Sequence, residues 1–454
     1  MKKTIIAIIT AANILFFSSF TKVCAGDNVS QEPQLPNAAS CILVDSKTGM
    51  VLYEKNSHAR LYPASTTKVL TAAVGLELAK PGQLMTASAA AVRDIGKDGM
   101  NIGIMAGEQL YFEDLLKALL ITSANETANI IAENLFDTRQ DFIDYMNKKA
   151  AELGARDTHF VNANGVHHKE HYTTAADMAI FARYAMTFPK FREIVSTVNY
   201  QLPPTNKHDS WPILYTTNRL IRYPDNSKWK SDSFEFTGIK TGFTEPAGFN
   251  LVASAKNSNG MELISVVMCV KNYDNASGLD AKTAVNVYTK RLMDYGFSNY
   301  AVQTVIKKGD KIAEFSVSNA KDGSPLAAVA DEDIKSVLPV DVYKWDIQTD
   351  VEQIENLQAP IAKGTFVGKL KIRRKGILLG ETPLVSAHDI EAKNLIDKIM
   401  SPESKSAGIH SNKNNIARYI LPSVAIIIVL ASYFLIRKRR TRSTNLHKFN
   451  IFKK

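Results

Sequence analysis

The stretch Leu61-Tyr62-Pro63-Ala64-Ser65-Thr66-Thr67-Lys68 leads into an apolar run with helical periodicity, and Pro63 is typical of a helix start. Spacing i, i+3 places the Ser65 hydroxyl and the Lys68 amine on one face, one turn apart. A serine becomes a nucleophile when a base takes its proton. A lysine can be that base when burial or nearby positive charge lowers its pKa from ~10.4 toward ~7–8. The pattern predicts Ser65 as a nucleophile and Lys68 as its base.

The Ser-x-x-Lys pattern alone is weak evidence for an active site. The chain repeats it at Ser318-Asn319-Ala320-Lys321, in a polar turn that no apolar helix follows. A second element, Ser123-Ala124-Asn125, lies between two runs with helical periodicity. Ser123 and Glu126 also fit a capping box for the following helix. A capping box does not need Asn125, so we interpret the tripeptide as part of a site.

Lys240-Thr241-Gly242 closes the strand-like run that begins at Phe234. A strand edge can pair with an extended substrate backbone, and glycine lets that backbone approach closely. Lys240 and Thr241 can hold an anionic end of the substrate. The same tripeptide at Lys47-Thr48-Gly49 is expected to be a hairpin turn. The order of the three motifs along the chain is that of class A β-lactamases and penicillin-binding proteins.

The chain resembles the low-molecular-weight penicillin-binding proteins, which are serine D-alanyl-D-alanine carboxypeptidases. The likeness runs from about Ala39 to Asp389, and its most specific stretch is Thr237-Gly238-Ile239-Lys240-Thr241-Gly242-Phe243-Thr244. The other matching stretches are Ser46-Lys47-Thr48-Gly49, Asn164-Gly165-Val166, His171 to Met178, Ala247 to Ala255 and Gly380-Glu381-Thr382-Pro383-Leu384-Val385.

The resemblance implies an activity, that is, removal of the last D-alanine from peptidoglycan stem peptides, and covalent inhibition by β-lactams such as penicillin. It makes Ser65 the acylated nucleophile, Lys68 its base and Ser123 a proton relay. It also implies that Asn125 contacts the substrate amide and that Lys240, Thr241 and Gly242 bind the carboxylate end. Backbone N–H groups of Ser65 and Phe243 would form the oxyanion hole. Some relatives carry histidine where Phe243 stands, and Arg219 is a candidate for a further carboxylate contact.

Several alternatives remain beside this function. A related endopeptidase or transpeptidase would use the same site, and a catalytically inactive surface scaffold would bind β-lactams without turnover. A β-lactamase would need a deacylating glutamate. No Glu-x-x-Leu-Asn pattern follows Ser123, and Glu170 lies in a histidine-rich loop. His167, His168 and His171 match no standard zinc spacing and are expected in a solvated loop, so we predict neither a metal nor another cofactor.

The fold class expected is α/β (α+β). Strand-like runs at Ser40 to Val44 and Met50 to Lys55 suggest a hairpin, and helical periodicity extends from Pro63 to about Arg156. A helix over Thr174 to Met186, three strands after Ser233 and a helix over Ala281 to Tyr295 complete the pattern. This predicts a β-lactamase/transpeptidase-like domain over 26–298, in which helices flank an antiparallel sheet. Strand-like runs with turn signals predict a small all-β domain over 299–392.

The two ends of the chain carry its basic excess. The net charge is +10, with three lysines before Asp27 and eight basic residues after Ile436, so a nucleic-acid-binding body is excluded. Residues 1–25 are typical of a signal peptide, with cleavage after Ala25. The uncharged residues 419–436 predict a transmembrane helix, between a polar stalk at 393–418 and a basic cytoplasmic tail at 437–454. The expected protein is bacterial and single-pass, with its catalytic domain on the extracellular face of the cell membrane.

Cysteine usage excludes a disulfide framework. Cys24 leaves with the predicted signal peptide, and Cys41 and Cys269 lie in apolar strand-like runs. Both are expected to be buried thiols.

Overall fold

The computed structural model describes residues 32–97, 99–272, 278–321 and 323–394. The predicted signal peptide, the membrane span, the basic tail and all of the stalk beyond residue 394 lie outside the described residues. Within those described ranges, no helix combines the length and the apolar character needed to cross a bilayer.

A five-stranded antiparallel sheet organises the first part of the chain. Its strand order is β2-β1-β9-β8-β7, so β7 is an edge strand. The strands are β1 (Ser40–Asp45), β2 (Val51–Lys55), β7 (Glu235–Thr244), β8 (Gly248–Lys256) and β9 (Glu262–Val270). The strands β1, β8 and β9 are buried along most of their length, as strands covered on both faces are. The hairpin and the three later strands predicted from the sequence are confirmed.

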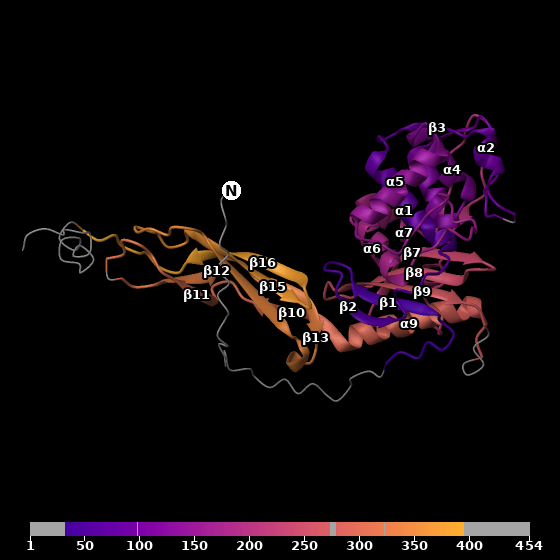
Figure 1. Ribbon diagram of the computed structural model, residues 1–454. Coiled ribbons are helices and arrows are strands. Elements are labelled where there is room, and N and C mark those ends of the chain that lie inside the picture. The colour runs from indigo at the N-terminus through magenta and orange to yellow at the C-terminus, as the bar shows by residue number, and fades with distance from the viewer. Residues whose placement is uncertain (1–31, 98, 273–277, 322, 395–454) are drawn as a thin grey trace, which may run out of the picture. The chain divides into compact units, whose positions relative to one another are not determined.

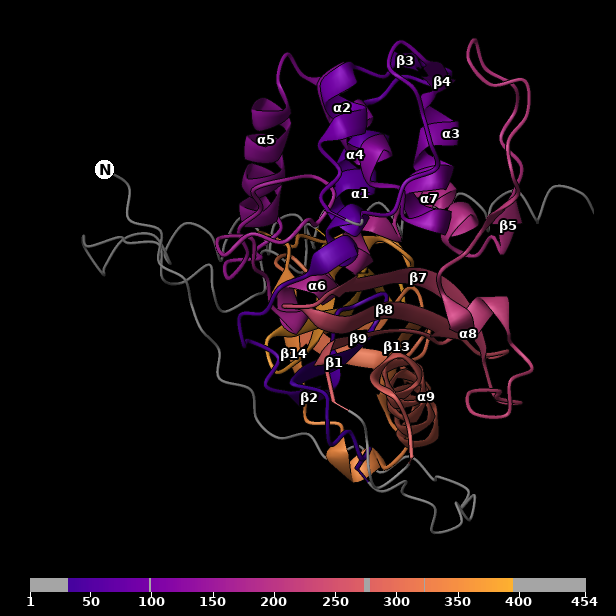
Figure 2. The same cartoon turned by 90° about the vertical axis from the view of Figure 1, so that its right-hand side faces the viewer.

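Helices cover both faces of this sheet (Figure 1 and Figure 2). The helix α9 (Ala281–Asn299) packs on one face, and α6 (Ala175–Ala185) packs on the other. The other helices of this region are η1 (Ala64–Thr67), α1 (Lys68–Leu78), α2 (Ala89–Arg93), α3 (Phe112–Lys117), η2 (Ala118–Thr122), α4 (Asn125–Leu135), α5 (Arg139–Glu152), α7 (Pro189–Val195) and α8 (Arg219–Arg222). Of these, η1, α7 and α8 contact β7 directly.

The core of the helical layer surrounds α1. Its first eight residues are all buried, so this helix is apolar on every side, as helices in the middle of a domain are. The α4 and α5 helices and η2 pack around it. The start of α1 is therefore enclosed by protein, and that is where the Ser-x-x-Lys motif lies.

The helical prediction over Pro63 to Arg156 was too uniform. Two short strands, β3 (Leu84–Thr86) and β4 (Gln109–Tyr111), pair with each other inside it. A second small pair, β5 (Asn199–Tyr200) with β6 (Leu214–Tyr215), precedes α8. Strands of two or three residues leave too little alternation for a periodicity argument to detect.

The region after α9 is built of strands, as predicted. β10 (Tyr300–Ile306) pairs with β13 (Ile334–Pro339), and a five-stranded sheet has the order β11-β12-β16-β15-β14. Lys375 and Gly376 form the hairpin turn between its two longest strands, and both have positive φ. The strands of this sheet are β11 (Lys311–Phe315), β12 (Leu326–Ala330), β14 (Ile347–Gln353), β15 (Phe366–Arg374) and β16 (Ile377–Ser386), and η3 (Val342–Lys344) is its short helical turn.

The described chain divides into two compact units. One comprises the described residues up to Phe315 with Ala327–Glu355 and Lys363–His388; the other comprises Ser316–Leu326, Asn356–Ala362 and the described residues from Asp389. The β-rich region is therefore shared between the units.

The two cysteines differ in exposure. Cys41 is buried in β1, and burial raises the pKa of its thiol to about 12. Cys269 is only partly buried, which corrects the expectation for that residue. Its backbone has φ +59°, and its N–H donates to Asn250 Oδ1 at 2.7 Å. The backbone therefore departs from regular strand geometry at Cys269.

Candidate active site

Ser65 lies in the 3-10 turn η1, and Lys68 is the first residue of α1. The Lys68 amine is 2.9 Å from Ser65 Oγ, so the predicted i, i+3 juxtaposition is present as a direct contact. Ser65 is partly exposed, whereas Lys68 is 0% exposed. A substrate can therefore reach the hydroxyl while the amine behind it stays out of water.

Two further acceptors surround the Lys68 amine. Asn125 Oδ1 lies 2.7 Å away and the Asn164 carbonyl oxygen lies 2.5 Å away. Neither oxygen can donate a hydrogen bond. A neutral amine has two N–H bonds for these two acceptors, and its lone pair is then left for the Ser65 O–H. The arrangement holds the base with its lone pair toward the nucleophile.

Burial and charge favour this neutral form of Lys68. Burial lowers the pKa of Lys68 well below its usual value, and the positive charge of Lys240 lowers it further. The buried Glu126 acts in the opposite direction and is the smallest of the three effects. The site thus contains a lysine whose neutral form is favoured, and that form can accept a proton.

Ser123 follows η2, a π-helical turn, and has the left-handed backbone conformation φ +69°. Such turns are frequent at functional sites because they displace one residue from the helical path. The capping-box alternative is wrong, since Ala124 is the N-cap of α4 and makes no side-chain capping bond. Ser123 therefore does not cap α4.

Asn125 begins α4, and both ends of its amide are engaged. Its Oδ1 accepts from Lys68, and its Nδ2 donates to the Ile95 carbonyl at 2.8 Å. These contacts set the amide orientation. The structure thus gives Asn125 a role in orienting Lys68, which the sequence did not suggest.

Glu126 fixes the loop that faces Asn125. Its Oε1 accepts from the Ile102 N–H at 2.7 Å, while burial raises the pKa of the carboxyl group. In the described chain its Oε2 is buried without a hydrogen-bond partner. The residue that the sequence placed in a capping box instead anchors the loop at Ile102.

Lys240 and Thr241 lie on the edge strand β7. The Lys240 amine is buried, donates to the Thr241 carbonyl at 2.9 Å, and has its pKa lowered to about 7 by burial. Thr241 Oγ1 lies 2.7 Å from Thr217 Oγ1. Thr217 is a contact that no motif indicated.

Gly242 is required for the packing of β7 against the turn that carries Ser65. A Cβ at this position would lie 2.9 Å from the Pro63 carbonyl oxygen and 3.0 Å from the Thr66 nitrogen. We expected the absence of a side chain at Gly242 to let the substrate backbone approach. In the structure, the backbone of the turn that carries Ser65 already occupies that space. The next residue, Phe243, is 47% exposed and stacks on Phe249 with ring centroids 4.3 Å apart.

One residue of the histidine loop, His171, contacts the turn η1 that carries Ser65. His171 is buried and lies 2.8 Å from Thr67 Oγ1, and its Nδ1 accepts from the Val161 N–H. Thr67 donates in turn to the Ala64 carbonyl at 2.8 Å, so His171 must carry its proton on Nε2. Burial is the largest cause that lowers the pKa of His171, to about 3.

The expectation of a solvated histidine loop is therefore wrong for His171, although His167 and His168 are exposed. His167 packs edge-on against Tyr62. The described residues contain no group of three or more His, Cys, Asp or Glu side chains arranged to hold a metal ion.

The repeated motifs lie apart from this chemistry. Ser318 donates to the Leu357 carbonyl, while Lys321 pairs with Glu391 at 2.8 Å. Thr48 donates to Asp45 from both its N–H and its hydroxyl, which confirms the predicted hairpin turn. The candidate Arg219 donates to Thr283 Oγ1 and lies over the Trp229 ring.

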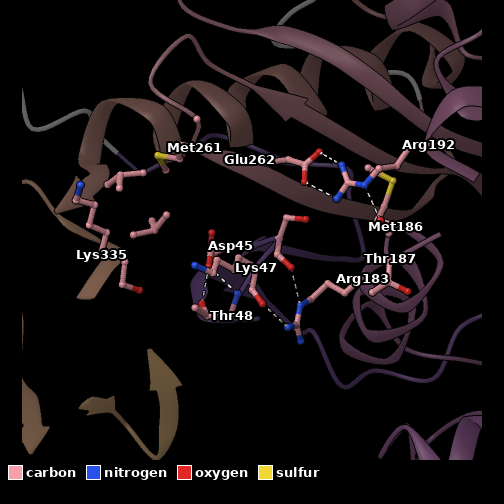
Figure 3. A pocket seen from close by; sticks show the side chains of 15 residues that line it. Asp45, Lys47, Thr48, Arg183, Met186, Thr187, Arg192, Met261, Glu262 and Lys335 are labelled. Carbon is pink, nitrogen blue, oxygen red and sulfur yellow. Dashed lines mark hydrogen bonds and ion pairs between the residues drawn. The ribbon is translucent and has the colours of Figure 1, made fainter. Parts of the chain in front are cut away.

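A cavity of about 480 Å³ lies beside that hairpin turn (Figure 3). In its wall Arg192 pairs with Glu262 at 2.6 Å, and Arg183 donates to the Ser46 and Lys47 carbonyls. None of the Ser65, Ser123 or Lys240 motif residues lines it. Arg183 thus stabilises the turn, and the cavity is separate from the candidate active site.

The geometry thus brings Ser65 and Asn125 into direct contact with Lys68, and the positive charge of Lys240 acts on Lys68. Sequence reasoning missed Asn164, His171 and Thr217. The resemblance included the stretches around Asn164 and His171, but nothing in them showed that a backbone carbonyl or a buried imidazole would support the nucleophile.

Comparison with known proteins identifies the family. Residues 27–272 match the family described as D-alanyl-D-alanine carboxypeptidase, and residues 300–392 match the C-terminal domain of penicillin-binding protein 5. The chain belongs to the D-alanyl-D-alanine carboxypeptidase family. This confirms the predicted serine-type activity and the mixed α/β fold with a C-terminal β domain.

Similar carboxypeptidases occur in several bacteria. The chain is 30% identical over 362 residues to the D-alanyl-D-alanine carboxypeptidase DacF of Bacillus subtilis, which covers 79% of this chain and 87% of that one. It is 27% identical over 402 residues to DacA of Haemophilus influenzae, at 85% and 95% coverage.

Solved structures show the same likeness. Penicillin-binding protein 5 from Haemophilus influenzae has a TM-score of 0.61 and 27% identity, covering 80% of this chain and 99% of its own. The peptidoglycan synthesis regulatory factor (PBP3) from Streptococcus pneumoniae has a TM-score of 0.63 and 25% identity, with 78% and 99% covered. The likeness to the D-alanyl-D-alanine carboxypeptidases therefore includes both the peptidase and the β region.

Proposed function

We propose that the chain removes the terminal D-alanine of peptidoglycan stem peptides through an acyl-enzyme on Ser65. The observation that carries this proposal is the Lys68 amine, which lies 2.9 Å from Ser65 Oγ and is held by two obligate acceptors. A neutral amine in this position can take the hydroxyl proton as the oxygen attacks the carbonyl carbon of the substrate.

In acylation, the Ser65 oxygen forms an ester with the penultimate D-alanine, and the C–N bond to the last residue breaks. The leaving amine takes a proton, which Lys68 supplies through Ser123. Backbone N–H groups of Ser65 and Phe243 stabilise the oxyanion, and one such donor is typically worth about 10²–10³ in rate. Water then hydrolyses the ester and restores the Ser65 hydroxyl.

The substrate backbone pairs with the free edge of β7, in the manner of strand addition. Its terminal carboxylate lies against the Thr241 hydroxyl and the positive charge of Lys240. Asn125 contributes its remaining amide N–H to the substrate, because its oxygen and its other hydrogen are engaged by Lys68 and Ile95. Penicillins, which carry a comparable carboxylate and acylating carbonyl, occupy the same site and label Ser65 covalently.

The decisive experiment measures D-alanine release from a stem pentapeptide together with labelling by fluorescent penicillin. Ser65→Ala is expected to lose both. Ser318→Ala, in the repeated Ser-x-x-Lys pattern, is a matched control that should keep both. Penicillin labelling of the Ser65→Ala protein would overturn the nucleophile assignment. An unmodified protein that binds penicillin but releases no D-alanine would support the scaffold alternative.

We also propose a membrane location for this enzyme. The amino-terminal pattern at 1–25 supports export, and the uncharged segment 419–436 between basic residues supports a single span with the basic tail inside. The catalytic domain then lies on the extracellular face of the cell membrane, where peptidoglycan is.

A further inference from the structure

Asn250 lies on β8, directly opposite Gly242 on β7. It is 2% exposed and belongs to none of the three catalytic motifs. Side chains that lie opposite each other in an antiparallel pair project from the same face of the sheet. Gly242 faces the turn η1, because a Cβ on it would lie 2.9 Å from the Pro63 carbonyl oxygen. Asn250 therefore projects toward the chain segment that leads into Ser65.

Three hydrogen bonds engage the whole Asn250 amide. Its Nδ2 donates to the Tyr62 carbonyl at 2.9 Å and to the Pro63 carbonyl at 3.0 Å. Its Oδ1 accepts from the Cys269 N–H at 2.7 Å. An amide nitrogen has two N–H bonds, so both are used by protein carbonyls and neither is left for a substrate. One side chain thus joins β8, β9 and the segment before Ser65.

The sheet has a β-bulge at this side chain. The register between β8 and β9 shifts between Phe249 and Leu251. Two residues of β9, Met268 and Cys269, therefore face Asn250 alone, and Cys269 has φ +59°. Bulges are frequent next to active sites, where they redirect a group out of the regular ladder. Here the bulge supplies the N–H that fixes the orientation of the Asn250 amide.

The Pro63 carbonyl is the point at which the turn meets the sheet. It accepts from Asn250 and also from the Thr66 hydroxyl at 2.7 Å. The absence of a side chain at Gly242 lets this carbonyl approach β7, while Asn250 holds it against β8. A side chain that cannot donate, in place of Asn250, would release the carbonyl and let the turn shift along β7. The position of η1 on β7 is therefore set by this pair of residues.

The two proposed donors of the oxyanion hole lie on opposite sides of this contact. The Ser65 N–H belongs to η1, and the Phe243 N–H belongs to β7. Stabilising an oxyanion requires both donors about 2.7–3.1 Å from its oxygen, so a small shift of the turn misplaces one of them. Lys68 begins the helix that continues the turn, so the base would move together with the nucleophile. The spacing of the two N–H groups is the feature that depends on Asn250.

We propose that Asn250 is a positioning residue for acylation, which sets the spacing of the oxyanion hole by fixing the segment before Ser65 to β8 and β9. This inference deepens the proposed function and rests on it. The oxyanion forms only as the Ser65 oxygen attacks, so Asn250 should affect the rate of acylation far more than the binding of intact substrate. A residue that served only the stability of the fold would not separate these two quantities.

The test compares Asn250→Asp with Asn134→Asp in the purified full-length chain. Asn134 makes the same set of bonds away from the catalytic motifs: its Nδ2 donates to the Thr86 and Ile130 carbonyls, and its Oδ1 accepts from the Thr86 N–H. Aspartate keeps the acceptor oxygen in both variants and removes both N–H donors. Asn250→Ala, which brings no charge into the interior, separates the loss of the donors from the effect of the added charge.

Stopped-flow acylation by penicillin gives the dissociation constant of the first complex and the acylation rate constant separately. We expect the rate constant to fall about 10- to 100-fold in both Asn250 variants, a smaller loss than removal of a whole donor causes, while the dissociation constant changes less than about threefold. The kcat and KM for D-alanine release from a stem pentapeptide should divide in the same way. A peptide boronic acid, whose tetrahedral adduct on Ser65 places an oxygen in the hole, should lose affinity by a similar factor. Asn134→Asp should change none of these quantities.

An unchanged acylation rate constant in a folded Asn250 variant would overturn this inference, and so would a loss confined to the dissociation constant or to KM. Similar losses in Asn134→Asp would show a general effect of destabilisation, with the same consequence. If neither Asn250 variant folds, as judged by thermal unfolding, the amide serves the fold and not the oxyanion hole. Absence of D-alanine release and of penicillin labelling in the unmodified chain would overturn the proposed function, and this inference with it.

Discussion

At the scale of single residues, Lys68 shows how position determines chemistry. Its amine is chemically the same as that of a surface lysine. However, it is buried at the start of α1, in contact with Ser65, Asn125 and Asn164. Burial and the charge of Lys240 both favour the neutral form. The base role follows from these surroundings, so it can be tested by changing the basicity alone.

Lys68→Arg is expected to remove the base, because it places a permanently charged group where the neutral amine of Lys68 is favoured. A guanidinium stays protonated at every pH below about 12. It therefore cannot take the Ser65 proton near neutral pH. The rate of acylation by penicillin, measured by stopped-flow or gel fluorescence, should fall by at least about 10²-fold, the lower range for general-base catalysis. Acylation within threefold of the unmodified rate, with the variant folded, would move the base role to another residue.

Lys240 predicts a pH dependence of substrate binding. Burial lowers its pKa to about 7 in the free enzyme, so it is charged below that pH and neutral above it. We expect kcat/KM for a pentapeptide to fall as pH rises through about 7, because the carboxylate loses its cationic partner. A peptide ending in a carboxamide is the matched control, whose kcat/KM should be lower and lack this alkaline decline.

Residue identity and spacing are enough to assign Ser65, Lys68 and Asn125 to the site from the sequence alone, because each belongs to a motif with a short, recognisable internal spacing. The supporting residues could not be found in that way. Asn164 acts through its backbone carbonyl, which any residue possesses, and its effect depends on a contact across 96 positions of sequence. The orientation of the Asn125 amide depends equally on Ile95, a residue with no chemical signature.

At the scale of elements, the turn η1 is held by groups from distant segments. Gly165 approaches so closely that a Cβ on it would lie 2.0 Å from the Ala64 carbonyl oxygen, and Gly165 has φ +85°. His171 donates to Thr67, which donates to the same carbonyl. Ala64 itself has φ +49°. The conformation that presents Ser65 is thus imposed by its neighbours.

His171 predicts acid sensitivity of the fold. Its pKa is about 3 in the folded protein, against an ordinary value of 6.5. Its contribution to stability is therefore complete above pH 6.5 and is lost as pH falls toward 3, because the unfolded chain binds the proton first. The free energy of unfolding should fall by up to about 1.4 kcal/mol per pH unit in this window from this residue.

Chemical denaturation at several pH values measures this dependence, with His171→Gln as the comparison. The variant should be less stable at pH 7 and should have a shallower pH dependence by about one proton. An unchanged slope would show that His171 does not account for the acid sensitivity.

Periodicity found the long elements well. The strands β8 and β9, the hairpin and α6 lie within a few residues of their predicted positions, because each carries several turns or alternations of apolar residues. It failed for η2, because a single π-helical turn within an apolar helical run is too short to change the periodicity. The displacement of Ser123 that η2 produces depends on packing around α1 and has no sequence signal of its own.

At the scale of the whole molecule, the basic excess lies at the chain ends and the catalytic motifs lie between them. This distribution allowed the catalytic region and the proposed anchor to be separated from sequence alone. The match to the C-terminal domain covers residues 300–392, and the boundary at 299 stays a prediction. The division of the β-rich region between two compact units was not predicted, because it depends on which loops pack together.

A chain truncated before Tyr419 is expected to leave the membrane fraction and to keep full activity on a small peptide, because Ser65, Ser123 and Lys240 all precede the β region. Fractionation of cells followed by D-alanine release from the soluble fraction measures both properties. Truncated protein that still sediments with membranes would reveal a second attachment. Loss of small-peptide activity would show that the segment beyond 418 shapes the site.

The two buried lysines have a consequence for how this protein can change over evolutionary time. Removing an ammonium group from water without a carboxylate partner opposes folding by several kcal/mol, and Lys68 and Lys240 are 0% and 1% exposed. Catalytic groups that oppose folding in this way reduce the margin by which the fold exceeds the stability it needs. The number of destabilising substitutions that the rest of the chain can accumulate therefore depends on these two lysines.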